Sequence, residues 1–106
     1  MRTERLAVSV YMVAEIEIRD HDLYSKYVER VAEVVEQHGG RYLVRGGRVT
    51  PLSGNWDPER MILIEFETVE QLRRCFRSAE YLELAPLREQ STVSKSIIVE
   101  SYSPSE

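Results

Sequence analysis

Arginine, glutamate and tyrosine recur at alternating positions in three short segments of the chain, and these residue types can bind anions and move protons. Arginine forms paired hydrogen bonds with carboxylates, and a tyrosine or glutamate within reach of a reacting atom can act as a general acid or base. The set comprises Tyr11, Glu15, Arg41, Arg45, Glu65 and Glu67. We take Tyr11 and Glu65 as catalytic candidates, and Arg41 and Arg45 as candidates for holding a carboxylate or enolate.

The same side chains also suit a structural role, because buried charges are retained when they pair. A cross-strand pair of Arg45 with Glu65 would fix the register of a sheet and the specificity of a dimer. Trp56 and Arg60, from a connection that contains Pro51 and Pro58, are two further ligand-binding candidates that can cover a barrel mouth or pack against a partner subunit. The structural and the functional interpretation both stay open.

Other residues that often carry chemistry are placed unfavourably for it. His21 and His38 stand at opposite ends of one expected helix, so they cannot converge on one metal within a chain. Cys75 lies on an apolar seam, which favours packing over a nucleophilic role. The glycine pairs at 39–40 and 46–47 lack the spacings of phosphate-binding loops. We predict no metal site and no bound cofactor.

The first half of the chain has a clear pattern of elements. Apolar residues at every second position from Val8 to Arg19 predict a strand. Asp20 can cap a helix over about 21–38, and Gly39 can end it. Residues 41–45 predict a second strand, with Tyr42 and Val44 on one face and Arg41, Leu43 and Arg45 on the other. A long hairpin connection follows over 48–60, where residues 49–52 can extend the second strand as an edge.

The second half repeats the strand and helix order. Residues 61–67 predict a third strand that turns Ile62, Ile64 and Phe66 toward the helices. Residues 68–71 match a capping box that begins a helix. Ser78 can begin a further short helix, which Pro86 should break or kink. Residues 94–100 predict the last strand, and 101–106 form a polar tail.

The element order is typical of the α+β ferredoxin-like βαββαβ fold, with a four-stranded antiparallel sheet and helices on one face. In this topology the third strand lies between the first and the second. The 106 residues predict a single domain, with its core over about 8–100. The sheet face without helices would carry a broad apolar patch, and such patches usually mark an interface. The patch comprises Tyr11, Val13, Leu43, Met61 and Leu63.

Composition excludes several function classes. Eighteen acidic against fourteen basic residues give a net charge of -4, which disfavours nucleic acid as a partner. The longest apolar stretch, 8–18, is interrupted by Glu15 and Glu17 and is too short for a membrane helix. A single cysteine and a start without a signal-peptide pattern predict a cytoplasmic protein.

Several segments together resemble one known family, the domain of unknown function 1330 family within the dimeric α/β-barrel superfamily. The most specific segment is GGRYLVRGG at 39–47, and the others are Tyr24 with Tyr27, WDPER at 56–60, IEF at 64–66, SAEY at 78–81 and PLR at 86–88. The resemblance implies a fold and a homodimer. It implies no reaction, because the family has no settled activity.

These observations favour a cytoplasmic homodimer with a pocket on the sheet face for a small anionic organic molecule, with catalysis left open. One alternative is a non-catalytic structural or interaction module whose sheet face serves only to dimerise. Another is a cofactor-independent monooxygenase, which rests on fold analogy.

Overall fold

The computed structural model describes residues 9–102. The chain start, Val8 and most of the predicted polar tail lie outside the described residues. The elements in chain order are β1 (Val10–Ile18), α1 (His21–Gln37), β2 (Arg41–Arg45), β3 (Arg60–Phe66), α2 (Val69–Phe76), α3 (Ala79–Ser91) and β4 (Thr92–Glu100).

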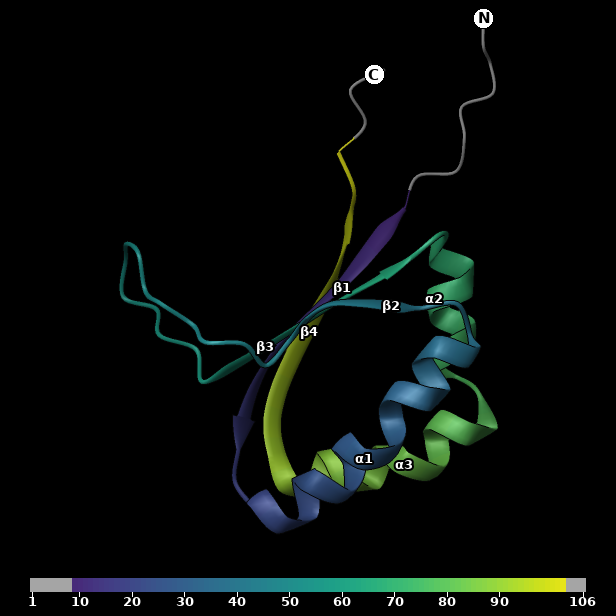
Figure 1. Cartoon of the computed structure of the whole chain (residues 1–106), viewed down its shortest axis with the longest axis horizontal. Helices are drawn as coiled ribbons and strands as arrows, with labels where there is room; N and C mark the ends of the chain where they lie inside the picture. The colour runs from purple at the N-terminus through teal and green to yellow at the C-terminus, as the bar shows by residue number, and fades with distance from the viewer. Residues whose placement is uncertain (1–8, 103–106) are drawn as a thin grey trace, which may run out of the picture.

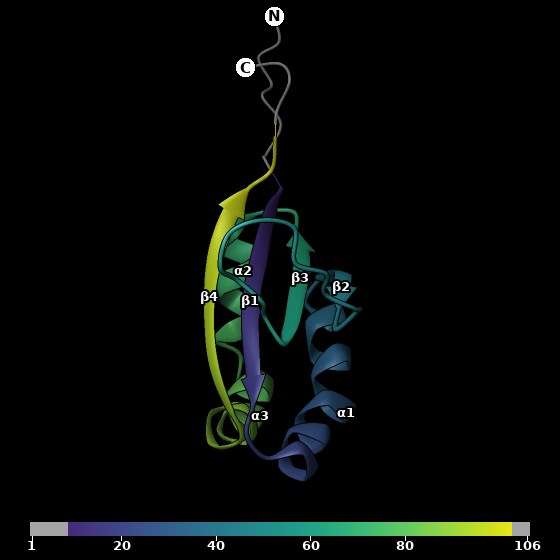
Figure 2. The ribbon, with the colours of Figure 1, turned by 90° about the vertical axis from the view of Figure 1, so that its left-hand side faces the viewer.

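The four strands form one antiparallel sheet in the order β2-β3-β1-β4. The predicted position of β3, between β1 and β2, is confirmed. The helices cover one face of this sheet, as Figures 1 and 2 show from two sides. The architecture is therefore the predicted ferredoxin-like α+β fold.

Each helix begins at the polar residue that the sequence indicated. The side chains of Asp20, Thr68 and Ser78 accept hydrogen bonds from backbone amides three residues further on, which satisfies donors that a helix start leaves free. The reciprocal half of the capping box is shifted by one residue, because the Gln71 side chain accepts from the amide of Glu67.

The third helix corrects one prediction. Pro86 lies inside α3, which runs on to Ser91 instead of breaking. A proline removes one helical hydrogen bond and crowds the preceding turn. The burial of Tyr81, Leu84 and Ala85 in the shared core holds the helix together across that position.

The connection between β2 and β3 forms an extended arm, defined here as residues 46–59. It contains no strand, so the predicted extension of β2 through 49–52 is wrong. Pro51 lacks the amide that a further pair of strand hydrogen bonds would use. The arm projects on the side of the sheet away from the helices (Figures 1 and 2).

The core lies between the sheet and the helices. The predicted inward residues of β3, Ile62, Ile64 and Phe66, are buried there against Val35 of α1 and Leu84 of α3. At the far end of the sheet, the Ser101 amide donates a 2.9 Å hydrogen bond to the Ser9 carbonyl, which ties the end of β4 to the start of β1. No helix within residues 9–102 is long and apolar enough to cross a bilayer.

Candidate functional site

A β-bulge in β2 decides where Arg45 points. Tyr42 pairs with Ile64, but the next paired positions are Val44 with Leu63 and Arg45 with Ile62. Leu43 is therefore an extra residue without a paired position on β3. Val44 and Arg45 lie on the faces opposite to those that regular alternation would give them. The prediction that Arg45 lies on the helix-free face is wrong, since its partner Ile62 faces the helices.

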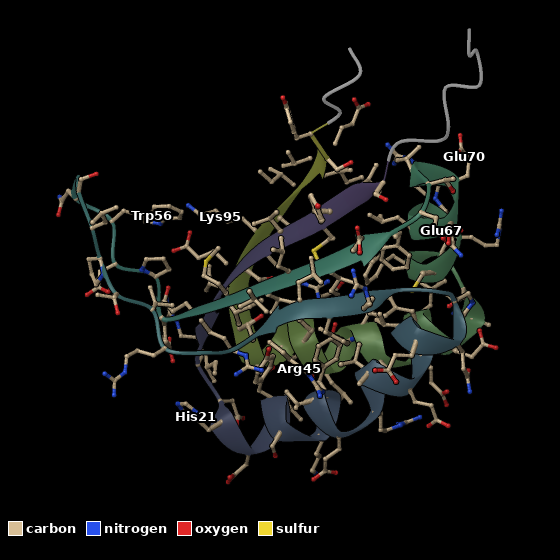
Figure 3. All side chains as sticks on the ribbon, turned by 45° about the horizontal axis from the view of Figure 1, so that its top comes forward. His21, Arg45, Trp56, Glu67, Glu70 and Lys95 are labelled. Atoms are coloured by element: carbon tan, nitrogen blue, oxygen red, sulfur yellow. The ribbon has the colours of Figure 1, made fainter. Side chains whose placement is uncertain are left out.

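Arg45 contacts the first helix. Its Nη2 donates a 2.8 Å hydrogen bond to the Val28 carbonyl, and its guanidinium lies 5.0 Å from the centre of the Tyr42 ring. Figure 3 shows the side chain between β2 and α1. An arginine over an aromatic face is stabilised by the negative potential of the ring.

Arg60 occupies the neighbouring position. Its Nε donates to the Tyr24 hydroxyl at 3.2 Å, and its guanidinium lies 5.6 Å from the Tyr24 ring centre. The guanidinium also lies over Gly46, where an added Cβ would collide with it. Gly46 has a φ of 78°, a conformation that glycine adopts without strain.

The two arginines line a cavity of about 650 Å³ between the sheet and the helices. The cavity is therefore on the helix side, and the prediction of a pocket on the helix-free face is not what the structure shows. Small helix-facing side chains on β1 and β4 leave the space, namely Ala14, Ser94 and Ser96. Most of the remaining lining is apolar, as in typical small-molecule sites.

A hydrogen-bonded network lies on the α3 side of the cavity. The hydroxyls of Tyr27 and Tyr81 share a 2.8 Å hydrogen bond, and Arg88 Nε donates to the Tyr81 hydroxyl at 3.1 Å. Arg88 Nη1 also donates to Ser94 Oγ at 2.9 Å. Burial raises the pKa of Tyr27 far above its ordinary value and that of Tyr42 to about 12. Both phenols therefore stay protonated at neutral pH, and neither is a base there.

This network was missed by the sequence analysis. In the sequence, Tyr24 and Tyr27 stood out together only as residues of the family resemblance. A detectable signal was the hydroxyl group that each adds to a buried position, because such hydroxyls require partners. Arg88 follows Tyr81 by seven residues, so the two share a helix face.

The other candidates lie on the helix-free face or on the arm. Arg41 Nη2, not Arg45, pairs with Glu65 at 2.6 Å, and Tyr11 stands opposite Glu65 in the register. Trp56 Nε1 donates to Glu15 at 3.4 Å, near Lys95 (Figure 3). The structure thus brings Arg45 and Arg60 together at the cavity, and it leaves the remaining candidates outside it.

The two histidines remain apart, at the ends of α1. His21 is exposed at the helix start (Figure 3), and His38 Nδ1 donates to the Val34 carbonyl at 2.9 Å. Across residues 9–102, His, Cys, Asp and Glu form no group of three that could hold a metal ion. Cys75 is buried, and burial raises its thiol pKa to about 11.

The profile of the family described as domain of unknown function (DUF1330) matches residues 9–102. The chain belongs to this family. No curated protein is detectably similar to it in sequence. The family resemblance of segments such as 39–47 is thereby confirmed.

Solved structures show the same fold. RPA0582, a protein of unknown function from Rhodopseudomonas palustris, has a TM-score of 0.78 at 18% identity, over 92% of this chain and 85% of that one. SnoaB, a cofactor-independent oxygenase from Streptomyces nogalater, has a TM-score of 0.64 at 14% identity, over 92% and 96% of the two chains. At these identities the likeness shows the fold alone and no activity.

Proposed function

We propose that this protein is a homodimer that binds a small organic anion in the cavity between its sheet and helices. The observation that carries the binding proposal is a pair of guanidinium groups, Arg45 and Arg60, at a largely apolar cavity. No aspartate or glutamate of residues 9–102 forms an ion pair with either of them. Tyr11, Glu65, Arg41 and Trp56 have no part in binding at this cavity.

A bound anion would reduce the electrostatic repulsion between Arg45 and Arg60. Two like charges close to each other repel. A carboxylate that accepts hydrogen bonds from both guanidiniums removes this repulsion, and charge-assisted hydrogen bonds of this kind are the strong ones. We propose no reaction, because the phenols of Tyr27 and Tyr42 are protonated and the likeness to oxygenases extends only to the fold.

A pair of fluorescent probes tests the binding proposal. The anionic probe 1-anilinonaphthalene-8-sulfonate should bind the wild type and bind Arg45→Met or Arg60→Met about tenfold more weakly, since one charged hydrogen bond contributes about 1.5 kcal/mol or more. The neutral probe N-phenyl-1-naphthylamine should bind all variants within about twofold. Arg41→Met, on the opposite face, is the matched control. Equal affinity of the anionic probe for all variants would contradict the proposal.

The homodimer is supported by the apolar surface of the helix-free face. Val13, Leu63, Ile97 and Val99 are neighbours there by strand register, and Ile97 is 61% exposed in the single chain. On the same side, the arm carries Leu52 at 98% exposure and Trp56 at 60%. Contiguous apolar surface of this kind is typical of an interface.

Sedimentation velocity at micromolar concentration tests the dimer. The wild type should sediment as a dimer, and Ile97→Glu should sediment as a monomer because it places charges against each other at the interface. Leu82→Glu changes a similarly exposed residue of α3 and should remain dimeric. A wild-type monomer, or a dimeric Ile97→Glu variant, would overturn this part of the proposal.

A cytoplasmic location completes the proposal. It is supported by the single cysteine, since secreted domains of this size commonly rely on disulfides. Fractionation of cells that express the tagged chain should recover it with cytoplasmic markers. Recovery with secreted material would contradict this location.

A further inference from the structure

We infer that the ligand is an amphiphilic carboxylate, with its head group between Arg45 and Arg60 and its apolar body directed toward Leu72 and Phe76. This inference rests on the proposed anion-binding function and adds the chemical class and the orientation of the ligand. It depends on a segregation of charge and apolar surface along the cavity.

The strand register places the charged groups at one end. One helix-facing row across the sheet runs Ser94, Ile16 and Arg60, and the next runs Ser96, Ala14, Ile62 and Arg45. The third row is Ile98, Met12, Ile64 and Tyr42. Such rows are about 6.8 Å apart, since an antiparallel strand rises about 3.4 Å per residue. Both arginines thus stand in the first two rows, and the cavity becomes apolar beyond them.

The first helix runs alongside these rows and shows the same segregation. Tyr24 accepts the hydrogen bond from Arg60, and the carbonyl of Val28 accepts the one from Arg45. Tyr24 and Val28 are one helix turn apart in the chain, so both guanidiniums contact the same stretch of α1. One carboxylate, with its two oxygens, can accept from both.

The far end of the cavity contains no charged side chain. It is lined by Val31 and Val35 of α1, Leu72 and Phe76 of α2, and Ile64 of β3. An apolar body placed there is removed from water, which is favourable in proportion to the area covered. The cavity volume of about 650 Å³ lies within the range of sites for small organic ligands.

The third arginine of the cavity is already satisfied. Arg88 donates to Tyr81 and to Ser94, and its Nη2 lies 3.7 Å from Glu89. It therefore does not add a third charge to the head-group position. Two available guanidiniums match a single carboxylate, and this argues against a ligand with anionic groups at both ends.

Straight-chain carboxylates from hexanoate to dodecanoate, used to displace 1-anilinonaphthalene-8-sulfonate, test the inference. Affinity should rise about fourfold for each added methylene until the apolar end is filled. The primary alcohols of equal length should bind at least tenfold more weakly than the acids. In Arg45→Met this difference between acid and alcohol should disappear, while the chain-length dependence is retained.

A second variant tests the orientation of the ligand. Ile98 lines the cavity in the third row and is 38% exposed on the edge strand β4, so a larger side chain can be accommodated. Ile98→Trp should shorten the tightest-binding acid by two or more carbons. Val93→Trp, on the opposite face of the same strand and outside the residues named for the dimer interface, is the control and should leave the optimum unchanged.

The outcomes separate the two proposals. Arginine-dependent binding of the anionic probe without any rise in affinity along the acid series would overturn the amphiphilic ligand and leave anion binding intact. The same would follow if Ile98→Trp kept the wild-type optimum. Acid affinities that are equal in the wild type, Arg45→Met and Arg60→Met would overturn both.

Discussion

The guanidinium of Arg60 occupies the space in which a side chain at residue 46 would stand. Gly46 is therefore required twice, by its positive φ and by its contact with Arg60. The residue that follows β2 thus controls the position of a side chain from β3. In this corner of the cavity, the absence of a Cβ at one residue permits the placement of a charge at another.

Replacement of Gly46 by alanine separates these two requirements from each other. Gly54 has the same φ of 78° but nothing within 4 Å of an added Cβ, so Gly54→Ala should show only the backbone strain, about 1–2 kcal/mol. Gly46→Ala should lose more stability than this in urea unfolding and should also bind the anionic probe more weakly. Equal effects of the two substitutions on probe binding would show that Arg60 is not displaced.

The sequence indicated the types of side chain at the site more successfully than their positions. Arg45 and Arg60 were candidates and line the cavity, whereas Arg41 and Trp56 were candidates and do not. The predicted face of Arg45 assumed regular alternation along β2. The unpaired residue Leu43 reverses that alternation. The buried tyrosines were missed because their rings satisfy the apolar pattern of a helix, and the pattern carries no information about their hydroxyls.

The edge strand β2 places Arg45 at the candidate site. A regular strand from Arg41 to Arg45 would turn Arg41 and Arg45 to the same face. The bulge at Leu43 instead leaves Arg41 with Glu65 on one face and directs Arg45 to the other. Bulges are common on edge strands, where they redirect individual side chains.

Deletion of Leu43 tests this account of the strand. The shortened strand keeps the pairs of Tyr42 with Ile64 and Arg45 with Ile62, so Arg45 should still face the helices. We expect a folded protein whose affinity for the anionic probe is within about threefold of wild type, measured by fluorescence titration. A folded deletion variant that has lost arginine-dependent binding would mean that the bulge does more than redirect Arg45.

Elements with a strong periodic pattern and a polar cap were predictable, and irregular ones were not. The ranges of β1, α1 and β3 follow from alternation, from Asp20 and from the turn at Gly39. A bulge breaks alternation by one residue and leaves no distinct sequence pattern. The continuation of α3 through Pro86 depends on tertiary packing, which outweighs local preference and is not visible in a single segment.

Phenol and thiol groups are buried between the sheet and the helices. Their burial makes the protein less stable at alkaline pH. Burial raises the pKa of Tyr42 from 10.0 to about 12 and that of Cys75 from 9.0 to about 11, and the pKa of Tyr27 moves in the same direction. The folded protein therefore keeps protons that the unfolded chain releases. Since the unfolded state binds fewer protons in this range, stability falls as pH rises.

We expect the free energy of unfolding to decrease steadily from pH 9 to pH 12. Tyr42 alone should account for about 1.4 kcal/mol of the loss by pH 11, because the unfolded phenol then lies about one pH unit above its pKa while the folded one is still protonated. Tyr42→Phe retains the ring and removes the titration, so its decrease between pH 8 and pH 11 should be smaller by this amount. Urea unfolding at the two pH values measures both. Identical decreases would contradict the assignment to Tyr42.

The hydrogen bond between Ser101 and Ser9 means that the described chain is nearly a closed ring. Its connectivity can therefore be rearranged without changing which strands pair. A circular permutant, with a short glycine linker from residue 101 to residue 9 and new ends between Ser53 and Gly54 in the arm, should fold to the same sheet and bind the anionic probe like the wild type. Circular dichroism and probe titration measure this, and a permutant that fails to fold would show that a continuous arm is required. If the permutant folds, the order of segments along the chain is separable from the arrangement of side chains that forms the cavity.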